Sequence, residues 1–278
     1  FDTTNVITPE VSVITSVGLD HIVSLGPTLA DIAWHKAGII KRHRPVVIGD
    51  LRPEALAVVE QEARLLEAPV LHVTASAAAL ATGMPGDFQA TNAALALGVM
   101  DALRSGGSVI PVAAERCGLA AARLPGRLER MPGGGPGVWL DGAHNADKMQ
   151  ALVSSLDSLV EQKPVFVVGA LGNKDIESMA GAIARAAGAV VSTEPHVLGK
   201  RALPAAEVAL ALRDAGFTGP VECEAEPLLA VSRAEEIGQA QNEPVLVTGS
   251  LYLVGEVRQR WFPAAAIVSQ RTPWPQQP

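Results

Sequence analysis

The stretch from Gly137 to Asn145 holds the residue types in this sequence that are best suited to chemistry. An apolar run, Val138–Leu140, is followed by Asp141, two small residues and His144. The helical pattern that begins directly afterwards predicts a buried strand that opens into a helix N-terminus. Ligands of open α/β sheets bind at such strand ends, so Asp141 and His144 are expected to face a crevice. Alternatively, Asn145 only caps the helix and Asp141 only makes a turn bond.

A second pair of candidates lies in the first half of the chain. His21 follows a β-branched apolar run, Val11–Val17, and Lys36 comes later on a helical pattern whose other marked positions are apolar. An exposed lysine is the ordinary arrangement at such a position. A buried lysine must lose its charge or find a partner. Reaction with carbon dioxide is one solution, because the resulting carbamate can bind a hard metal through oxygen.

Further polar residues stand at turns of the second half. Arg127 follows a Pro-Gly pair and precedes Glu129, so its guanidinium suits either phosphate oxygens or a structural ion pair. Lys174 follows another predicted strand at the same sheet edge as Asp141 and could meet an anion. Ser250 follows the last predicted strand, where it could cap a helix or contact a ligand.

Other classes of chemistry lack their motifs. There is no Gly-x-Ser-x-Gly sequence, and neither Cys117 nor Cys223 has a plausible base beside it. Gly199-Lys200 is followed by Arg201 and not by Ser or Thr, so it does not end a phosphate-binding loop. Two isolated cysteines suggest neither a disulfide framework nor a zinc site. Metal, phosphate and carboxylate chemistry remains the best class.

Length and composition fit a folded α/β protein. The chain has 278 residues, of which 48% are hydrophobic and 18% charged, enough for one large or two ordinary domains. The net charge is −7 and no basic stripe is present, so nucleic acid is not an expected partner. No apolar run of about eighteen residues and no charged-then-apolar leader occurs, so we expect no membrane span or export signal and a cytoplasmic protein.

The first half is expected to form βαβαβ alternation, hence a parallel sheet with helices on its faces. A Pro-Gly junction at Leu124–Arg127 is the expected domain boundary, which gives domains 1–123 and 124–278. The segment Thr74–Pro85 is expected to be a loop. The predicted strands are Val11–Val17, Pro45–Gly49 and Pro69–Val73, and the predicted helices are one capped by Thr28, Pro53–Glu67, Ala90–Leu103 and Val112–Ala122.

The second half alternates more clearly. We expect a hairpin-like loop at Pro132–Pro136 and a frayed tail after Val268. The predicted strands are Arg127–Met131, Val138–Leu140, Val165–Gly169, Ala189–Ser192, Val221–Cys223 and Val245–Thr248. The predicted helices are Ala146–Val160, Ile176–Ala187, Pro204–Ala215, Pro227–Gly238 and Tyr252–Trp261.

Taken together, the candidate motifs resemble a known family. In order and spacing they are similar to the dihydrofolate synthase/folylpolyglutamate synthase family of the Mur ligase group, over residues 1 to about 261. These motifs are Asp2-Thr3-Thr4-Asn5-Val6-Ile7, Thr15-Ser16-Val17-Gly18-Leu19-Asp20-His21, Lys36-Ala37-Gly38-Ile39, Pro125-Gly126-Arg127-Leu128-Glu129, Asp141-Gly142-Ala143-His144-Asn145 and Gly249-Ser250-Leu251-Tyr252.

The resemblance implies a fold and a reaction. The fold would be part of a P-loop-type parallel-sheet central domain, followed by a Rossmann-like C-terminal ligase domain. The reaction would be an ATP-dependent amide ligation of folate biosynthesis and one-carbon metabolism. A carboxylate of dihydropteroate or of a tetrahydrofolyl-(poly)glutamate would take the γ-phosphoryl group, and the amine of L-glutamate would displace phosphate from the acyl phosphate. Small molecules would be its only partners, and the protein would be a monomer.

The resemblance also assigns residues. His21 resembles a Mg²⁺ ligand, and Lys36 the lysine whose carbamate helps to hold metal and substrate. Asn92, Arg127 and Asp141 correspond to ATP contacts, and His144 lies beside the nucleotide with a catalytic role. Phe1, Asp2 and Thr3 correspond to a segment that contacts the pterin substrate. The site would therefore draw on both domains.

The sequence departs from the family pattern in three places. The family's Gly-Lys-Ser phosphate loop and its Glu metal ligand would lie upstream of Phe1, and neither is in this sequence, so we expect it to be an inactive fragment. Phe88 stands where the family usually has His before Gln89, and the loop around Thr74–Pro85 is short. Substrate positioning could therefore differ from the family's.

Two alternatives remain open. The first is a cell-wall Mur-type ligase that joins amino acids to a nucleotide-linked muramyl peptide. Those enzymes usually carry an aromatic residue in place of Gly142, so the spelling Gly-Ala-His-Asn favours a folate ligase. The second is a non-catalytic binding module on the same two sheets. The sequence does not decide between dihydrofolate synthase, folylpolyglutamate synthase and a bifunctional enzyme.

Overall fold

The structure, a computed structural model, describes residues 3–19, 22–74, 82–172 and 175–276. The chain forms two compact units, which are described one at a time. Unit 1 comprises Phe1–Gly83 and Phe88–Ala122, and unit 2 comprises Met84–Asp87 and Arg123–Pro278. Both units are α/β with parallel sheets, as the alternation of apolar runs and helical patterns predicts.

The sheet of unit 1 has three parallel strands in the order β1-β2-β3. Each strand is shorter than the apolar run that predicted it. Pro45 and Pro69 lack an N–H group to donate, so the ladder of the second and third strands begins one residue later. The carbonyl of Pro45 still accepts from Ser12 N at 3.0 Å. The bounds are Ser12–Ile14 for β1, Val46–Ile48 for β2 and Val70–His72 for β3.

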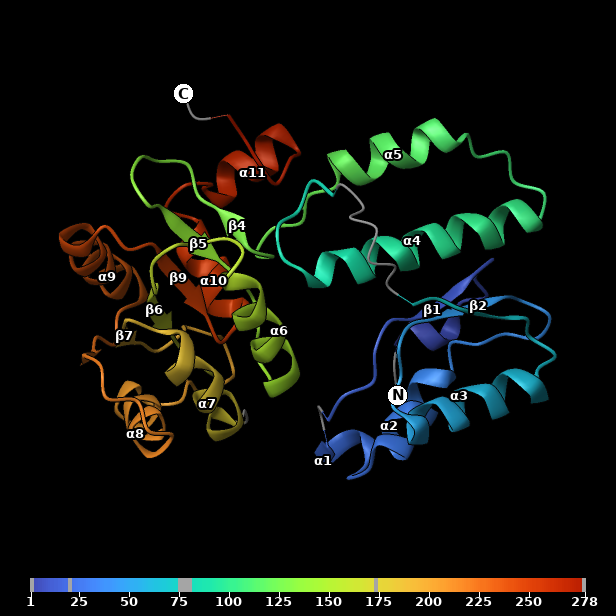
Figure 1. Cartoon of the computed structure of the whole chain (residues 1–278), viewed down its shortest axis with the longest axis horizontal. Coiled ribbons are helices and arrows are strands. Elements are labelled where there is room, and N and C mark those ends of the chain that lie inside the picture. Colours follow the sequence, from blue (N-terminus) through green and yellow to red (C-terminus); the bar gives the residue numbers. More distant parts are fainter. Residues whose placement is uncertain (1–2, 20–21, 75–81, 173–174, 277–278) are drawn as a thin grey trace. The chain divides into compact units, whose positions relative to one another are not determined.

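Helices cover both faces of this sheet, as Figure 1 shows. Side chains alternate along a strand. Val46 and Ile48 therefore pack with α2 (Leu29–Ala37) and α3 (Pro53–Leu65), while Val47 packs with α4 (Phe88–Ser105) on the other face. The helix α4 can approach the sheet closely because Gly98 has no side chain. A Cβ there would lie 2.7 Å from Val73 Cγ2.

The helix boundaries of unit 1 follow local signals. Thr28 caps α2 in a capping box with Asp31, as predicted, and this bond from the Thr28 side chain lowers the pKa of Asp31. The helix α5 (Val112–Ala121) has no buried residue. Two short elements were not predicted, because neither carries a periodic apolar pattern. They are the 3₁₀ helix η1 (Thr3–Val6) and α1 (Ile22–Leu25).

The sheet of unit 2 has the order β4-β5-β9-β6-β7-β8. The strand β4 pairs antiparallel with β5 across the predicted Pro132–Pro136 loop, and all other pairs are parallel. Four of the six strands have the predicted bounds. The strands are Glu129–Arg130 (β4), Val138–Leu140 (β5), Val165–Val168 (β6), Ala189–Ser192 (β7), Val221–Cys223 (β8) and Val245–Thr248 (β9).

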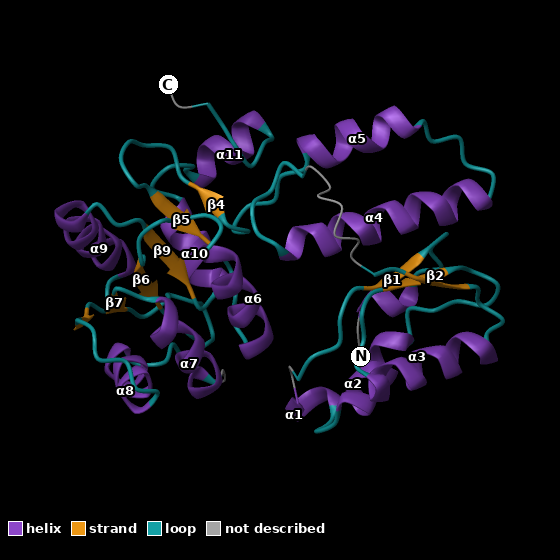
Figure 2. Ribbon diagram, viewed as in Figure 1, coloured by secondary structure: helices purple, strands orange, loops and turns teal. Residues whose placement is uncertain are grey.

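Two groups of helices cover the opposite faces of this sheet (Figure 2). The helices α6 (Ala146–Leu156), α7 (Ile176–Ala186) and α8 (Ala205–Asp214) pack side by side, whereas α9 (Pro227–Gln241) packs with α10 (Leu251–Arg258). The neighbouring strands β5 and β9 therefore lead into helices on opposite faces. Such a switch point is where α/β sheets bind ligands. No described helix has the length and apolar character needed to cross a membrane.

The expectation of a frayed tail was wrong. A further helix, α11 (Ala264–Gln270), is followed by Trp274, whose Nε1 donates to Glu129 Oε1 at 2.7 Å. Arg258 donates to both carboxylate oxygens of Glu129 at 2.8 Å and to Pro273 O at 2.7 Å. This buried network fixes the tail to unit 2, and the proline-rich composition gave no sign of it.

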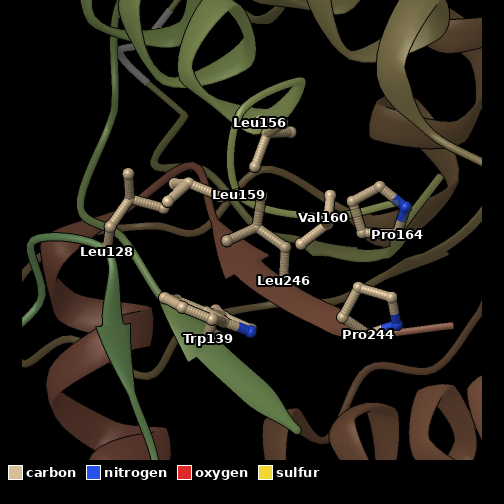
Figure 3. A pocket seen from close by; sticks show the side chains of 8 residues that line it. All are labelled: Leu128, Trp139, Leu156, Leu159, Val160, Pro164, Pro244 and Leu246. Carbon is tan, nitrogen blue, oxygen red and sulfur yellow. The ribbon is translucent and has the colours of Figure 1, made fainter. Parts of the chain in front are cut away.

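A small apolar hollow lies between the sheet of unit 2 and the end of α6; Figure 3 shows its eight lining residues. Its volume is about 10 Å³, whereas small-molecule sites measure hundreds. Nε1 of Trp139 is buried there without a hydrogen-bond partner among the described residues. The hollow is too small for a nucleotide. The candidate site of this unit is instead the switch point at the ends of β5 and β9.

Candidate functional site

Two turns meet at the switch point of unit 2. The turn after β5 contains Asp141 and His144, and the turn after β9 contains Gly249 and Ser250. Gly249 N donates to Ala143 O at 3.0 Å. Gly249 has a φ of +97°, and a Cβ there would lie 2.7 Å from Gly169 O, so only glycine fits. The backbone itself therefore joins the two turns.

Asp141 is buried, with 4% of its surface exposed. Its Oδ2 accepts from Leu128 N at 2.9 Å and its Oδ1 from Ala143 N at 2.8 Å. Burial raises the pKa of this carboxyl group, while the two backbone bonds and the charge of Arg127 oppose that rise. The carboxylate thus holds the turn that carries Arg127 against the turn that carries His144.

Arg127 lies in a tightly fixed turn. Gly126 on one side has a φ of +66°, and Leu128 on the other has a φ of 44°, which is uncommon for a leucine. Gly142 N donates to Gly126 O at 2.9 Å, and Arg127 Nη1 donates to the same carbonyl at 3.1 Å. Gly126 N donates to Glu129 Oε2 at 2.9 Å. The guanidinium of Arg127 is therefore held close to Gly142.

Gly142 has space for a side chain only if the ends of the Leu251 and Arg127 side chains move. A Cβ there would lie 2.1 Å from Leu251 Cδ2 and 2.9 Å from Arg127 Nη1. An aromatic residue at this position would displace both neighbours. This close approach gives a physical reason for the Gly-Ala-His-Asn spelling.

His144 and Asn145 begin α6. Asn145 Oδ1 accepts from Lys148 N at 3.0 Å, so Asn145 is the helix cap. His144 Nδ1 lies 2.7 Å from Gly142 O, and its Nε2 lies 3.0 Å from Lys148 Nζ. Asp141, Arg127 and His144 thus gather around Gly142, while Asp141 also makes the turn bond, and Asn145 the cap, of the alternative interpretation. Lys148 was not predicted, because a lysine in a first helical turn gives no signal of its own.

Ser250 acts as the cap of α10. Its Oγ accepts from Tyr252 N at 3.1 Å, which is the structural one of the two roles considered. Lys174 lies outside the described residues. The ligand contact of Ser250 stays a prediction.

In unit 1, Lys36 is half-buried in the last turn of α2. A cation there is favourable beside the helix dipole. The motif segment at the start of the chain packs against the end of this helix. Lys41 Nζ donates to Asn5 O at 2.8 Å and to Gly38 O at 2.9 Å, and a Cβ at Gly38 would lie 2.4 Å from Asn5 Nδ2. Asn5 Oδ1 is buried without a partner among the described residues, and the amide that carries it lies beside Gly38, two residues after Lys36.

The remaining predicted residues of unit 1 are placed only in part. Asn92 is exposed on α4, where its Nδ2 donates to Gln89 Oε1 at 2.9 Å. Phe1, Asp2 and His21 lie outside the described residues, and the side chain of Thr3 is not described. In the part of the chain that is described, no three His, Cys, Asp or Glu residues are grouped to hold a metal. The metal role of His21 and Lys36 therefore stays a prediction.

Comparison with known proteins gives consistent matches. Residues 126–251 match the Mur ligase, glutamate ligase domain family. The chain is 34% identical to a folylpolyglutamate synthase of Lacticaseibacillus casei, over 93% of this chain and 63% of that protein. It is also 34% identical to a dihydrofolate synthase/folylpolyglutamate synthase of Bacillus subtilis, over 94% of this chain and 64% of that protein. The chain thus spans less than two thirds of the length of either.

Solved structures agree with these matches. The folylpolyglutamate synthase of Mycobacterium tuberculosis in complex with ADP and AMPPCP superposes with a TM-score of 0.85 at 29% identity, over 94% of this chain and 66% of that one. An Escherichia coli FolC in complex with DHPP and ADP superposes with a TM-score of 0.77 at 25% identity, over 98% of this chain and 64% of that one. The fold and the sequence matches lead to one conclusion: this chain is a homologue of the folylpolyglutamate and dihydrofolate synthases, and its residues 126–251 match the Mur ligase, glutamate ligase domain family.

Proposed function

We propose that this chain is the glutamate-ligating part of an ATP-dependent ligase that adds L-glutamate to dihydropteroate or to a tetrahydrofolyl-(poly)glutamate. The observation that carries the proposal is the arrangement around Gly142, where Arg127 and His144 are fixed at the switch point of unit 2. The names of the relatives and the nucleotides in the solved structures support the same chemistry.

The proposed reaction has two steps. The substrate carboxylate attacks the γ-phosphorus of ATP, giving an acyl phosphate and ADP. The amine of glutamate then attacks the acyl carbon and phosphate leaves. Arg127 offers a planar cation that suits phosphate oxygens, and Asp141 keeps it in place through Leu128. Such preorganised charge is the main requirement of phosphoryl transfer.

Mg²⁺ is part of this proposal. His21 and a carbamate of Lys36 would hold it, and the unpartnered Asn5 Oδ1 beside Gly38 is an oxygen that fits such a cation. Bound there, the ion would offset charge on the transferring phosphoryl group. Asn92 is proposed to contact ATP, and residues 1–3 the pterin.

The test is incorporation of labelled L-glutamate by the protein expressed from its own gene. With ATP and either pterin substrate, one glutamate should be ligated for each phosphate released. Arg127→Met should lower kcat/KM for ATP by about 10²-fold, as loss of one preorganised donor does. Arg130→Met, which removes an exposed arginine of β4, should leave it unchanged. Ligation to a muramyl peptide instead, or nucleotide-independent binding without ligation, would show that an alternative function is right.

A further inference from the structure

His144 makes two contacts that define its protonation. Its Nδ1 lies 2.7 Å from Gly142 O, and a carbonyl oxygen can only accept a hydrogen bond, so Nδ1 carries the hydrogen. Its Nε2 lies 3.0 Å from Lys148 Nζ, and an ammonium group can only donate. These two contacts suit a ring whose Nε2 accepts and whose hydrogen is on Nδ1.

The start of α6 brings Lys148 to this ring. The backbone N–H of Lys148 is bound by the cap Asn145 at 3.0 Å, which fixes the residue one turn after His144. Lys148 lies in the first turn of α6, and its side chain folds back toward His144, which precedes the cap. A proton on Nε2 would set a donor against a donor and one positive charge beside another.

We propose that Lys148 is a positioning residue of this site, which acts through His144 by holding its ring as the neutral Nδ1–H form with the Nε2 lone pair engaged. In this form His144 does not exchange a proton with substrate through Nε2. Its part is to orient the Lys148 ammonium at the carboxyl end of β5. Gly142 connects this pair to Arg127, because its carbonyl binds His144 and its Cα lies against the guanidinium.

The consequence for catalysis rests on the proposed function. The cations of Arg127 and Lys148 are both connected to Gly142. Together they suit an anionic group, such as the acyl phosphate or a carboxylate of glutamate. If His144 were instead the proton carrier of the reaction, Lys148 would hinder it by occupying Nε2. The two roles therefore predict opposite effects of removing the lysine.

The test reads the tautomer of His144 directly. Long-range ¹H–¹⁵N spectra of the whole chain at pH 8, where unperturbed histidines are neutral, should show the Nδ1–H form. The His144→Gln spectrum identifies the resonances. Lys148→Met should keep Nδ1–H, because Gly142 O still accepts from it, but in a pH series its Nε2 should take a proton at a higher pH than in the wild-type protein, whereas Lys148→Arg, which keeps donors, should not. Lys163→Met is the control, because Lys163 is an exposed lysine of the same unit that bonds to Arg185 O.

The inference is overturned if His144 is in the Nε2–H form in the wild-type protein, or if Lys148→Met leaves the pH at which Nε2 takes a proton unchanged. In ligation assays Lys148→Met should lower kcat/KM about tenfold, the usual order for one partly exposed charged contact, and Lys148→Arg should restore most of it. A rise in kcat/KM for Lys148→Met would also overturn it. If the protein expressed from its own gene lacks ligase activity, the proposed function fails and the protonation of the His144 ring alone decides this inference.

Discussion

The two units hold their candidate residues in different ways. In unit 2, Asp141 is 4% exposed and both its oxygens bind backbone N–H groups of the fold. In unit 1, Lys36 is half-buried at the end of a helix, and its neighbours Ala37 and Ile40 fill the core instead. The polar residues of unit 2 are thus part of what stabilises it, whereas Lys36 is attached to an already stable helix.

This difference predicts how each unit responds to mutation. A change at the site of unit 2 should lower its free energy of unfolding together with any activity, since buried polar groups lose their partners. A change at Lys36 should alter activity with little effect on unfolding. The four experiments below test this contrast, and each has a matched control.

Glu129→Gln should have the largest effect. Burial opposes ionisation of Glu129, but bonds from Arg258, Gly126 and Trp274 outweigh it and hold its pKa below the usual 4.5. Removing one partner of a buried ion pair costs about 3–5 kcal/mol. Because the folded pKa is lowered, this stability is present above pH 4.5 and is lost as pH falls through the folded pKa. Urea unfolding at pH 7 and pH 4 should therefore show a large difference from wild type that shrinks in acid.

The control for Glu129 is Glu222→Gln. Glu222 also forms a two-pronged pair, with Arg233, and this partner lowers its pKa. The pair is exposed, with 42% and 46% of the two side chains accessible, so its loss should cost less than about 1 kcal/mol. Equal losses in the two variants would show that the tail network does not stabilise unit 2.

Asp141→Ala should come next. It leaves Leu128 N and Ala143 N buried without acceptors, at about 1–3 kcal/mol each. The raised pKa of Asp141 works in the opposite direction to that of Glu129, because ionising a buried acid costs stability as pH rises through its folded pKa. The net loss should therefore be about 3 kcal/mol in urea unfolding at pH 7. Asp157→Ala, at the exposed end of α6, should change unfolding by no more than about 0.5 kcal/mol.

Gly142→Ala should cost about 1–3 kcal/mol, since its Cβ must push Leu251 and Arg127 aside. The same substitution at Gly181 in α7 is the control. A Cβ there meets nothing closer than Arg185 Nη1 at 3.8 Å, so Gly181→Ala should stabilise by about 0.5–1 kcal/mol. Thermal unfolding of the two variants should move in opposite directions. If Gly142→Ala left the unfolding temperature unchanged, the turn would have space for a side chain at this position.

The sequence was informative where one local rule decides the outcome. Strands β5, β7, β8 and β9 have their predicted bounds because they are short apolar runs between turn residues. Thr28 and Asn145 cap helices as predicted because capping needs only neighbouring residues. The sequence placed Arg127 only at the Pro-Gly junction, so its position beside the turn of Asp141 was seen first in the structure.

Contacts between distant segments were not predictable in this way. Trp274 binds Glu129, which lies 145 residues earlier in the chain. Leu251 lies over Gly142 from the turn after another strand. Neither residue has a periodic pattern or a motif that names its partner. The Lys148–His144 bond is local, yet it depends on the rotamer of a long side chain, which composition and spacing do not determine.

Lys36→Met should have the smallest effect on stability and so gives the sharpest contrast with unit 2. Loss of a cation at a helix C-terminus costs about 0.3–1 kcal/mol, while the proposed ligation should fall to background because no carbamate can form. Lys41→Met should lower stability more, and ligation less, than Lys36→Met. It removes bonds to Asn5 O and Gly38 O, which should cost unit 1 about 1.5–3 kcal/mol per charged bond at most. Urea unfolding and glutamate incorporation measured on both variants would separate the two lysines. A Lys36→Met protein that unfolds as easily as Lys41→Met would place Lys36 in the fold and not in the site.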